Sequence, residues 1–298
     1  MLIDNNYTCP LCGGKGLTEH AKCTDFMVSY EQFTLLRCPN CGVVHTAGAP
    51  DESLTGNYDK ISLKLKQSDN PSGLLNVLFY HVRRVMLNRK ARLVEDMACR
   101  DTGSLLNYGA KTGYFSNFME NRGWNVTSIE KYHVERQFSL EMFHHRMLDV
   151  PEMDVLGEQS FDVITLWHVF EHNYHPKELL DRFYRLLRPQ GVLIMACPNL
   201  NSYDAAFYGD KWAGYDVPRH LWHFNPSSLA NLAGRHGFIL MHHEMLPYDS
   251  FYISILSEKN RGSRFYILKG MLRGLGFWAK SIGHRGQSSS IVYVFRKK

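Results

Sequence analysis

The stretch FDVITLWHVFEHNYHPKELLDRFYRLLRPQGVLIMACPN occupies residues 161–199 and decides the fold. Its two apolar ends, residues 161–170 and 191–198, are typical of strands that are buried on both faces. Between them, residues 176–189 begin and end with proline, which predicts a helix with defined ends. A buried strand, a helix and a second buried strand in this order predict two parallel strands joined by a crossover helix.

The same alternation continues on both sides of this stretch. Upstream, strands are expected at residues 104–109 and 125–130, with a weaker one at 143–148. Downstream, FILMHHEML and SSIVYVFRKK supply the last two strands. Further helices are expected at residues 113–123, 133–142 and 226–237. The pattern predicts an α/β fold with a doubly wound, Rossmann-like sheet of seven strands and helices on both faces.

Two cysteine pairs stand in the first fifty residues, in the segments CPLCGG and CPNCG. Each pair has two residues between its thiols, and the glycine after the second cysteine tolerates the positive φ of a tight turn. Two such pairs supply four thiolates, the usual ligand set of structural zinc. We therefore expect a zinc-ribbon-like module over residues 1–50, with a zinc site that stabilises the module without touching the chemistry. Its Zn²⁺ would be held by Cys9, Cys12, Cys38 and Cys41.

Charge is unevenly distributed along the 298 residues, although the net charge is only +5. Residues 60–94 carry eight Lys/Arg against one acid, and residues 259–298 carry ten against none. Residues 51–100 are expected to form a linker followed by an amphipathic helix from Leu74, because apolar positions recur there at three- and four-residue steps. Two basic segments on an otherwise acidic chain suggest an anionic partner, either a membrane surface or a nucleic acid.

Composition excludes several classes of protein. With 44% hydrophobic and 21% charged residues, the chain fits neither a disordered nor a fibrous protein. Its apolar runs are too short to cross a bilayer, and its first residues lack the pattern of a secretory signal. A cytoplasmic protein with reduced cysteines is therefore expected.

The first predicted strand leads into the turn NYGAKTG. Gly109 and Gly113 would allow a ligand to approach the backbone, and the helix that follows offers free N–H groups. The spacing differs from the dinucleotide fingerprint G-x-G-x-x-G. Glu130 ends the second strand, about twenty residues later, where a carboxylate can accept hydrogen bonds from the hydroxyls of a ribose.

Together these features resemble the class I S-adenosylmethionine-dependent methyltransferases, and more closely a bacterial branch with a zinc-ribbon-like segment before the catalytic domain. The resemblance rests on the paired cysteines, the NYGAKTG turn, Glu130, residues 161–199 and the segment YDVPRHLWHFNPSSLANLAGRHGF. It implies a methyltransferase domain over residues 101–298, with insertions on the substrate side at 199–225 and 249–288.

The resemblance also implies roles for residues around the cofactor. Glu130 would bind the ribose of S-adenosylmethionine, Asp149 would meet the adenine amino group, and Trp167 and His168 would border the methionine carboxylate and the sulfonium. The complete set implied for the cofactor is Asn107, Gly109, Gly113, Glu130, Asp149, Trp167 and His168.

Methyl transfer to a hydroxyl needs an acceptor that is held in line and a group that removes its proton. Histidine titrates near neutral pH and suits this role. His172 and His220 are the preferred catalytic candidates, because the segments HVFEH and PRH match the family. Arg219 would pair with an anionic acceptor or form a salt bridge, and both roles stay open.

Three functions remain open, of which methylation of a small-molecule, saccharide or lipid-like acceptor is favoured. The 199–225 insertion holds seven aromatic residues, which would form a wall for the acceptor or a lid packed on its own core. Residues 264–280 mix large apolar and basic residues, as in helices at an anionic membrane, although a helix packed on the enzyme has the same pattern.

The second function is RNA methylation, which the weakly basic amino-terminal module does not favour. The third is a non-catalytic methyltransferase-like binding protein. It is suggested by Asn107 and Lys111, which stand where the family usually has an aspartate and a glycine.

Overall fold

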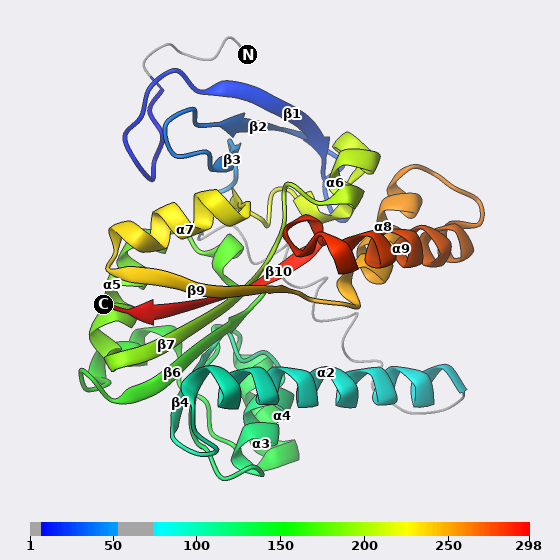
Figure 1. Cartoon of the computed structure of the whole chain (residues 1–298). Helices are drawn as coiled ribbons and strands as arrows, with labels where there is room; N and C mark the ends of the chain where they lie inside the picture. The colour runs from blue at the N-terminus through cyan, green and yellow to red at the C-terminus, as the bar shows by residue number, and fades with distance from the viewer. Residues whose placement is uncertain (1–6, 53–73) are drawn as a thin grey trace.

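The computed structural model describes residues 7–52 and 74–298, and Figure 1 shows its elements. Most of the expected linker lies outside these ranges. The helix expected from Leu74 is present as α2 (Leu74–Ala98). The strands form two sheets, one of four strands at the amino-terminal end and one of six strands at the centre of the molecule.

The central sheet has the strand order β5-β4-β6-β7-β10-β9. Its strands are β4 (Ser104–Tyr108), β5 (Asn125–Ile129), β6 (Phe161–Trp167), β7 (Leu187–Pro198), β9 (Phe238–Met245) and β10 (Ser290–Lys297). The first four lie parallel, and β10 runs antiparallel to both of its neighbours. The chain passes from β4 to β5 and then returns to the other side of β4 with β6, which creates a switch point at their carboxyl ends. The predicted doubly wound α/β fold is confirmed.

The central sheet has six strands among the described residues and not the predicted seven. The prediction is wrong at residues 143–148, where Leu148 makes a single parallel bridge to β5 instead of a strand. His144 ends helix α4 (His133–Phe143) in a left-handed conformation with φ 57°, and Asp149 opens a 3-10 helix (Val150–Val155) with a capping box. Between these two caps only Leu148 pairs with β5, so the segment does not form a strand.

Alternate residues of the central strands pack on opposite faces of the sheet. In β10, Tyr293 and Phe295 share a core with α5 (Pro176–Leu186) and α7 (Pro226–Arg235). Val292 and Val294 share the other core with α2 and α3 (Tyr114–Glu120). Figure 1 shows α7 and α2 on opposite sides of the sheet. Burial on both faces explains why these strands are almost continuously apolar.

The amino-terminal sheet joins two distant parts of the chain. β1 (Thr18–Thr24), β2 (Gln32–Arg37) and β3 (Val44–Ala47) are antiparallel, and β3 also pairs with β8 (Trp222–His223). Thr46 reinforces this junction, because its N–H donates to the carbonyl of Leu221 at 3.0 Å and its hydroxyl donates to the carbonyl of His220 at 2.7 Å. The first fifty residues are thus hydrogen-bonded to the insertion that follows β7.

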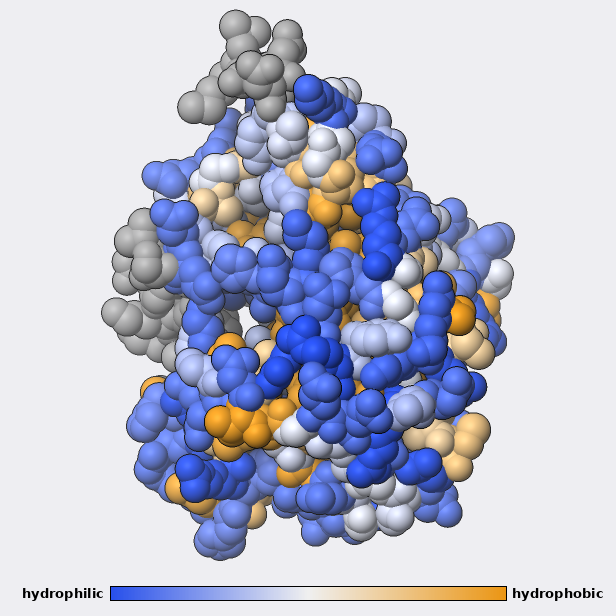
Figure 2. Space-filling view, turned by 90° about the vertical axis from the view of Figure 1, so that its left-hand side faces the viewer, coloured by the Kyte–Doolittle hydropathy of each residue, from blue (hydrophilic) through white to orange (hydrophobic). Residues whose placement is uncertain are grey.

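Two helices, α8 (Asp249–Asn260) and α9 (Tyr266–Gly283), form a hairpin that projects from one end of the central sheet (Figure 1). The side of the molecule away from this hairpin is mostly hydrophilic, and its apolar residues form separate patches (Figure 2). Within the described ranges, no helix combines the length and the apolar character that a membrane span needs.

Candidate active site

A cleft of about 1620 Å³ opens at the carboxyl ends of β4, β5 and β6. Its walls come from the loops of the central sheet, the loop between β1 and β2, the insertion after β7 and helix α8. This is the switch point at which open α/β sheets bind their ligands. The predicted site residues that line the cleft are Gly109, Glu130, Asp149, His168, His172 and His220.

The turn after β4 brings bare backbone to the edge of the cleft. Gly109 has φ 70°, and its N–H donates to the carbonyl of Ile129 at 2.8 Å. A Cβ atom at this position would collide with Val169. Glycine is therefore required here both by the conformation and by the space.

Glu130 and Asp149 are held on one side of the cleft by their hydrogen bonds. The buried carboxylate of Glu130 accepts the backbone N–H of Lys111 at 2.7 Å and that of Tyr132 at 3.1 Å. Arg136 donates to the Glu130 carbonyl at 2.7 Å and to the Asp149 carboxylate at 3.1 Å. The loops after β4 and β5 are thus shaped around the Glu130 carboxylate, and Arg136 links the Glu130 backbone to the Asp149 carboxylate.

Three other predicted residues do not line the cleft. Asn107 is buried under it, where its amide donates to the hydroxyl of Ser116 at 2.9 Å. Gly113 precedes α3 as its N-cap. The ring of Trp167 lies 4.3 Å from the ammonium of Lys90, on the face of the sheet that α2 covers. These residues support the walls of the cleft.

His168 forms ion pairs with two carboxylates. Its Nε2 lies 2.9 Å from Asp249 Oδ2, and its Nδ1 lies 3.4 Å from Glu171 Oε1. Burial alone would lower the pKa of His168, but Asp249 and then Glu171 outweigh burial and raise this pKa to about 9. The imidazole is therefore protonated at neutral pH, and it ties the first residue of α8 to the end of β6.

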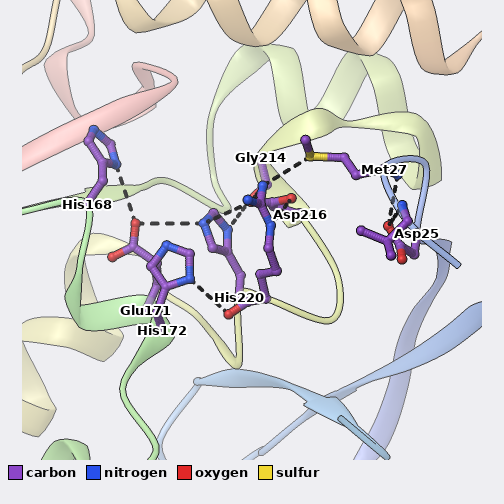
Figure 3. A network of polar contacts seen from close by, with 10 residues as sticks. Asp25, Met27, His168, Glu171, His172, Gly214, Asp216 and His220 are labelled. Atoms are coloured by element: carbon purple, nitrogen blue, oxygen red, sulfur yellow. Dashed lines mark hydrogen bonds and ion pairs between the residues drawn. The ribbon is translucent and has the colours of Figure 1, made fainter. Parts of the chain in front are cut away.

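Glu171 lies at the centre of a group of histidines (Figure 3). Its side chain is 1% exposed, and its carboxylate points between His168 and His220, whose Nε2 lies 3.9 Å from Oε1. Burial raises the pKa of a carboxyl group, but His168, His220 and His172 lower that of Glu171 to about 2. Glu171 is therefore a buried charge that is compensated by the imidazoles around it.

Backbone carbonyls fix the rings of His172 and His220. Their Nδ1 atoms lie 3.0 Å from the carbonyl oxygen of Arg219 and 2.9 Å from that of Gly214. A carbonyl only accepts hydrogen bonds, so each Nδ1 carries the hydrogen and each Nε2 of a neutral ring keeps a lone pair. Burial, followed by the charge of His220, lowers the pKa of His172 to about 3, so His172 is neutral.

The amino-terminal module reaches the cleft beside His220. Asp216 lies 3.7 Å from His220 Nε2 and forms an ion pair with Arg219, which also lines the cleft. Arg219 also contacts the sulfur of Met27, in the loop between β1 and β2, at 3.1 Å (Figure 3). The module thus contributes to the wall of the cleft, whereas its four paired cysteines do not line it.

The four paired cysteines converge at one end of the amino-terminal sheet. Their sulfur atoms all lie within 4.8 Å of one another, with 3.7 Å between Cys9 and Cys41 and 3.5 Å between Cys12 and Cys38. Four thiolates around one Zn²⁺ stand about 3.8 Å apart, given a Zn–S bond of about 2.3 Å. The donor set and its spacing therefore fit a tetrahedral zinc ion.

Three acidic residues of the site escaped the sequence analysis, although all three line or adjoin the cleft. Glu171 lies inside the HVFEH segment, and Asp216 stands four residues before His220. Asp249 lies at the start of α8, after α7 and β9. The signal that would have found Glu171 and Asp216 is an acid within a few residues of a candidate histidine, because such acids orient imidazoles and stabilise their charge.

The comparison with known families agrees with this geometry. The model of a methyltransferase domain family matches residues 78–243, which is more than half of the chain. The chain belongs to this family. The resemblance to class I S-adenosylmethionine-dependent methyltransferases and the predicted Rossmann-like fold are thereby confirmed.

Curated relatives match the middle of the chain. A ubiquinone biosynthesis O-methyltransferase of Psychrobacter cryohalolentis is 25% identical over 149 residues, 46% of this chain and 58% of the relative. A malonyl-[acyl-carrier protein] O-methyltransferase of Serratia marcescens is 30% identical over 126 residues, 41% of this chain and 48% of the relative. The chain thus spans about half the length of these relatives.

Solved structures share the fold at low sequence identity. The 1,6-didemethyltoxoflavin-N1-methyltransferase of Burkholderia thailandensis has a TM-score of 0.50 and 14% identity over 89% of this chain and 96% of that chain. It was solved with 1,6-didemethyltoxoflavin and S-adenosylhomocysteine bound. A methyltransferase from Archaeoglobus fulgidus has a TM-score of 0.50 and 14% identity over 79% of this chain and 99% of that chain.

The ion pairs of His168 predict a pH-dependent contribution to stability. The pKa of His168 is about 9 in the folded protein, above the ordinary value of a histidine, so folding favours its protonated form. The stabilisation is complete below about pH 6.5 and is lost as the pH rises through about 9. Urea unfolding of the parent and of His168→Gln should therefore differ most near pH 6 and least above pH 9.

His133→Gln provides the control, because His133 is exposed at the start of α4. It should leave the unfolding free energy unchanged at each pH. A destabilisation by His168→Gln that does not depend on pH would contradict the protonated state of His168.

Proposed function

We propose that the protein transfers a methyl group from S-adenosylmethionine to a hydroxyl group of an amphiphilic acceptor in this cleft. The observation that carries the proposal is the continuity of the cleft, which runs from the glycine turn and Glu130 to His172 and His220. One side offers bare backbone and a carboxylate for a nucleoside, and the other offers imidazoles that can take up a proton.

S-adenosylmethionine, when bound, supplies an electrophilic methyl group on a sulfonium. The side of the cleft with Gly109, Glu130 and Asp149 would hold it, with Glu130 toward the ribose and Asp149 toward the adenine. Asn107, Gly113 and Trp167 would act on it only through the walls that they support. The substitution of Asn107 for the usual aspartate then does not argue for a non-catalytic protein, since Asn107 bonds to Ser116 under the cleft.

His220 would remove the proton of the acceptor. His220 lines the cleft, and the carboxylates of Asp216 and Glu171, 3.7 Å and 3.9 Å from its Nε2, would stabilise the imidazolium that forms. His172 is a much weaker base, because its pKa is lowered to about 3. The acceptor oxygen would take the methyl group as its proton passes to His220, leaving S-adenosylhomocysteine.

The insertions favour an acceptor with an apolar part. Trp212, Tyr215, Tyr252 and Ile253 line the cleft next to His220 and Asp249. Such a wall binds apolar or ring-shaped groups and leaves the polar end of the acceptor at the histidines. The named relatives include two kinds of O-methyltransferase, which supports a hydroxyl or carboxyl oxygen as the target.

The four cysteines are proposed to bind structural Zn²⁺. The two turns that carry the cysteines have the same geometry. Gly13 and Gly42, each directly after the second cysteine of its pair, have φ 69° and 74°, and their N–H groups donate to the carbonyls of Cys9 and Cys38. Four protein ligands leave no open position on the ion. The zinc would therefore stabilise the module and, through Thr46, the backbone of His220.

Glu130→Gln should weaken the binding of S-adenosylmethionine by about 1.5–3 kcal/mol, roughly tenfold to a hundredfold, because a hydrogen bond to a charged group is lost. Isothermal titration calorimetry measures this directly. Glu141→Gln is the control, since Glu141 is exposed on α4 and outside the cleft. An unchanged affinity of Glu130→Gln would contradict the assignment of the ribose.

His220→Asn should lower kcat by about 10²–10⁴-fold, the usual contribution of a general base, and leave the affinity for S-adenosylmethionine unchanged. The assay follows radioactive methyl groups from S-adenosylmethionine into a bacterial lipid extract, a mixture of nucleotide sugars and total RNA. Label in the lipid extract would support the proposed acceptor class. His133→Asn is the matched control and should retain full activity.

Two results would contradict this function. Label in RNA alone would favour RNA methylation, and tight cofactor binding without transfer to any acceptor would favour a binding protein. A separate result would contradict the role of His220 as the base. It is a loss of activity with a chelator that an added divalent metal reverses while the four cysteines and their metal stay unchanged.

Metal analysis of the purified protein should find about one zinc per chain. Cys12→Ser and Cys38→Ser should each lower this content and the melting temperature, whereas Cys99→Ser should change neither, because Cys99 is exposed and outside the cluster. A fully folded metal-free chain with the melting temperature of the parent would exclude a structural zinc.

A further inference from the structure

The hairpin of α8 and α9 is held together by small residues. Gly270 and Gly274 of α9 lie directly on the backbone of α8, where a Cβ at Gly270 would collide with Ile255 and one at Gly274 would lie 2.7 Å from the Cα of Phe251. Close contact through glycines leaves the large apolar side chains of α9 free to point elsewhere. The packing of the hairpin therefore does not account for them.

Those large side chains form an exposed stripe, which we call the hairpin stripe. It consists of Phe265, Ile267, Leu268, Met271, Leu272, Leu275 and Ile282, each between 45% and 63% exposed. The six that lie within α9 fall in an arc of about 140° at 100° per residue. Nineteen large apolar residues are exposed in the described part of the chain, and seven of them lie in this stripe. Single exposed apolar residues are ordinary, but a continuous stripe of this size marks a binding surface.

The charge next to the hairpin stripe has one sign. Lys269, Arg273 and Lys280 follow it on the adjacent part of the α9 surface, and α9 contains no acidic residue. The exposed Arg84 lies on α2, which extends to the same side of the molecule as the hairpin (Figure 1). The side shown in Figure 2, by contrast, is mostly hydrophilic and has its apolar residues in separate patches. Apolar side chains flanked by cations match an anionic lipid surface.

The hairpin also borders the cleft. Tyr252, Ile253, Leu256 and Lys259 of α8 line the cleft, whereas the hairpin stripe lies on α9. A bilayer that receives the stripe would thus be separated from the cleft by the thickness of one helix. This position suits an acceptor that resides in the bilayer and enters along α8.

We propose that the hairpin stripe inserts into the interface of an anionic lipid bilayer, with Lys269, Arg273 and Lys280 at the head groups. The helix would lie in the interface without crossing it, in agreement with the absence of a membrane-spanning helix from the described residues. This inference goes beyond the proposed function, because it holds whichever acceptor the enzyme methylates.

Flotation of the full chain with vesicles tests the proposal. The vesicles consist of phosphatidylcholine alone or with one part in four of phosphatidylglycerol, at low and high salt. We expect binding to the anionic vesicles at low salt, weaker binding to the neutral vesicles, and a reduction by salt. Leu268→Asp combined with Leu272→Asp should reduce binding by at least about tenfold. The two exposed leucines would insert into the bilayer, whereas the charged aspartates would be excluded from it.

The matched control is Ile239→Asp combined with Met241→Asp, which changes two exposed apolar residues of β9 outside the hairpin. This variant should bind vesicles like the parent. Calorimetry with S-adenosylmethionine shows that each variant is folded, and it separates a failure of membrane binding from a failure of the proposed chemistry.

Three results would overturn the proposal. They are no binding to anionic vesicles at low salt, equal binding by the stripe variant and the parent, and self-association of the parent that the stripe variant abolishes. The last result, measured by analytical ultracentrifugation, would assign the stripe to contact with a second copy of the chain.

Discussion

The buried charge of Glu171 is the constraint on which the cleft depends. A carboxylate without partners in the protein interior is destabilising by several kcal/mol, so cations must be brought to it. The cation comes from the end of β6, as His168, and the insertion after β7 brings the Nε2 of His220 to 3.9 Å. The His168 cation in turn requires Asp249, which opens α8. The end of β6, the insertion after β7 and the start of α8 therefore meet around this carboxylate.

This chain of charges also separates the roles of neighbouring histidines. His168 is protonated between two carboxylates, whereas His172 is kept neutral chiefly by burial. A protonated histidine cannot accept a proton, and a histidine with a pKa of about 3 accepts one poorly. This is why we propose His220, whose Nε2 lies 3.7 Å from Asp216 and 3.9 Å from Glu171, as the group that removes the proton.

Features that depend on local patterns were predictable. The apolar strands of residues 161–199, the helix that begins at Pro176 and the paired cysteines all follow from spacing along the chain. Some bounds of these elements differ from the predicted ones. Helix α5 ends at Leu186 instead of at residue 189, and β7 begins at Leu187 instead of at residue 191. The seventh strand failed because only Leu148 pairs with β5 in the segment between the caps at His144 and Asp149.

The direction of side chains was harder to predict. Trp167 and His168 are adjacent in the sequence and were expected on the same ligand, but consecutive residues at a strand end point to opposite faces of the sheet. Trp167 lies behind the wall of the cleft, whereas His168 lines the cleft. The pairing of β3 with β8 joins residues about 175 positions apart, and no local pattern contains it.

The pairing of β3 with β8 has a consequence for where this protein can be divided. The recognisable family domain covers residues 78–243, and a natural place to cut would lie just before it. That cut would remove Thr46, which holds the carbonyl of His220, and Met27, which touches Arg219. The first fifty residues therefore support one wall of the cleft, and an evolutionary exchange of this module between relatives would have to carry a matching insertion with it.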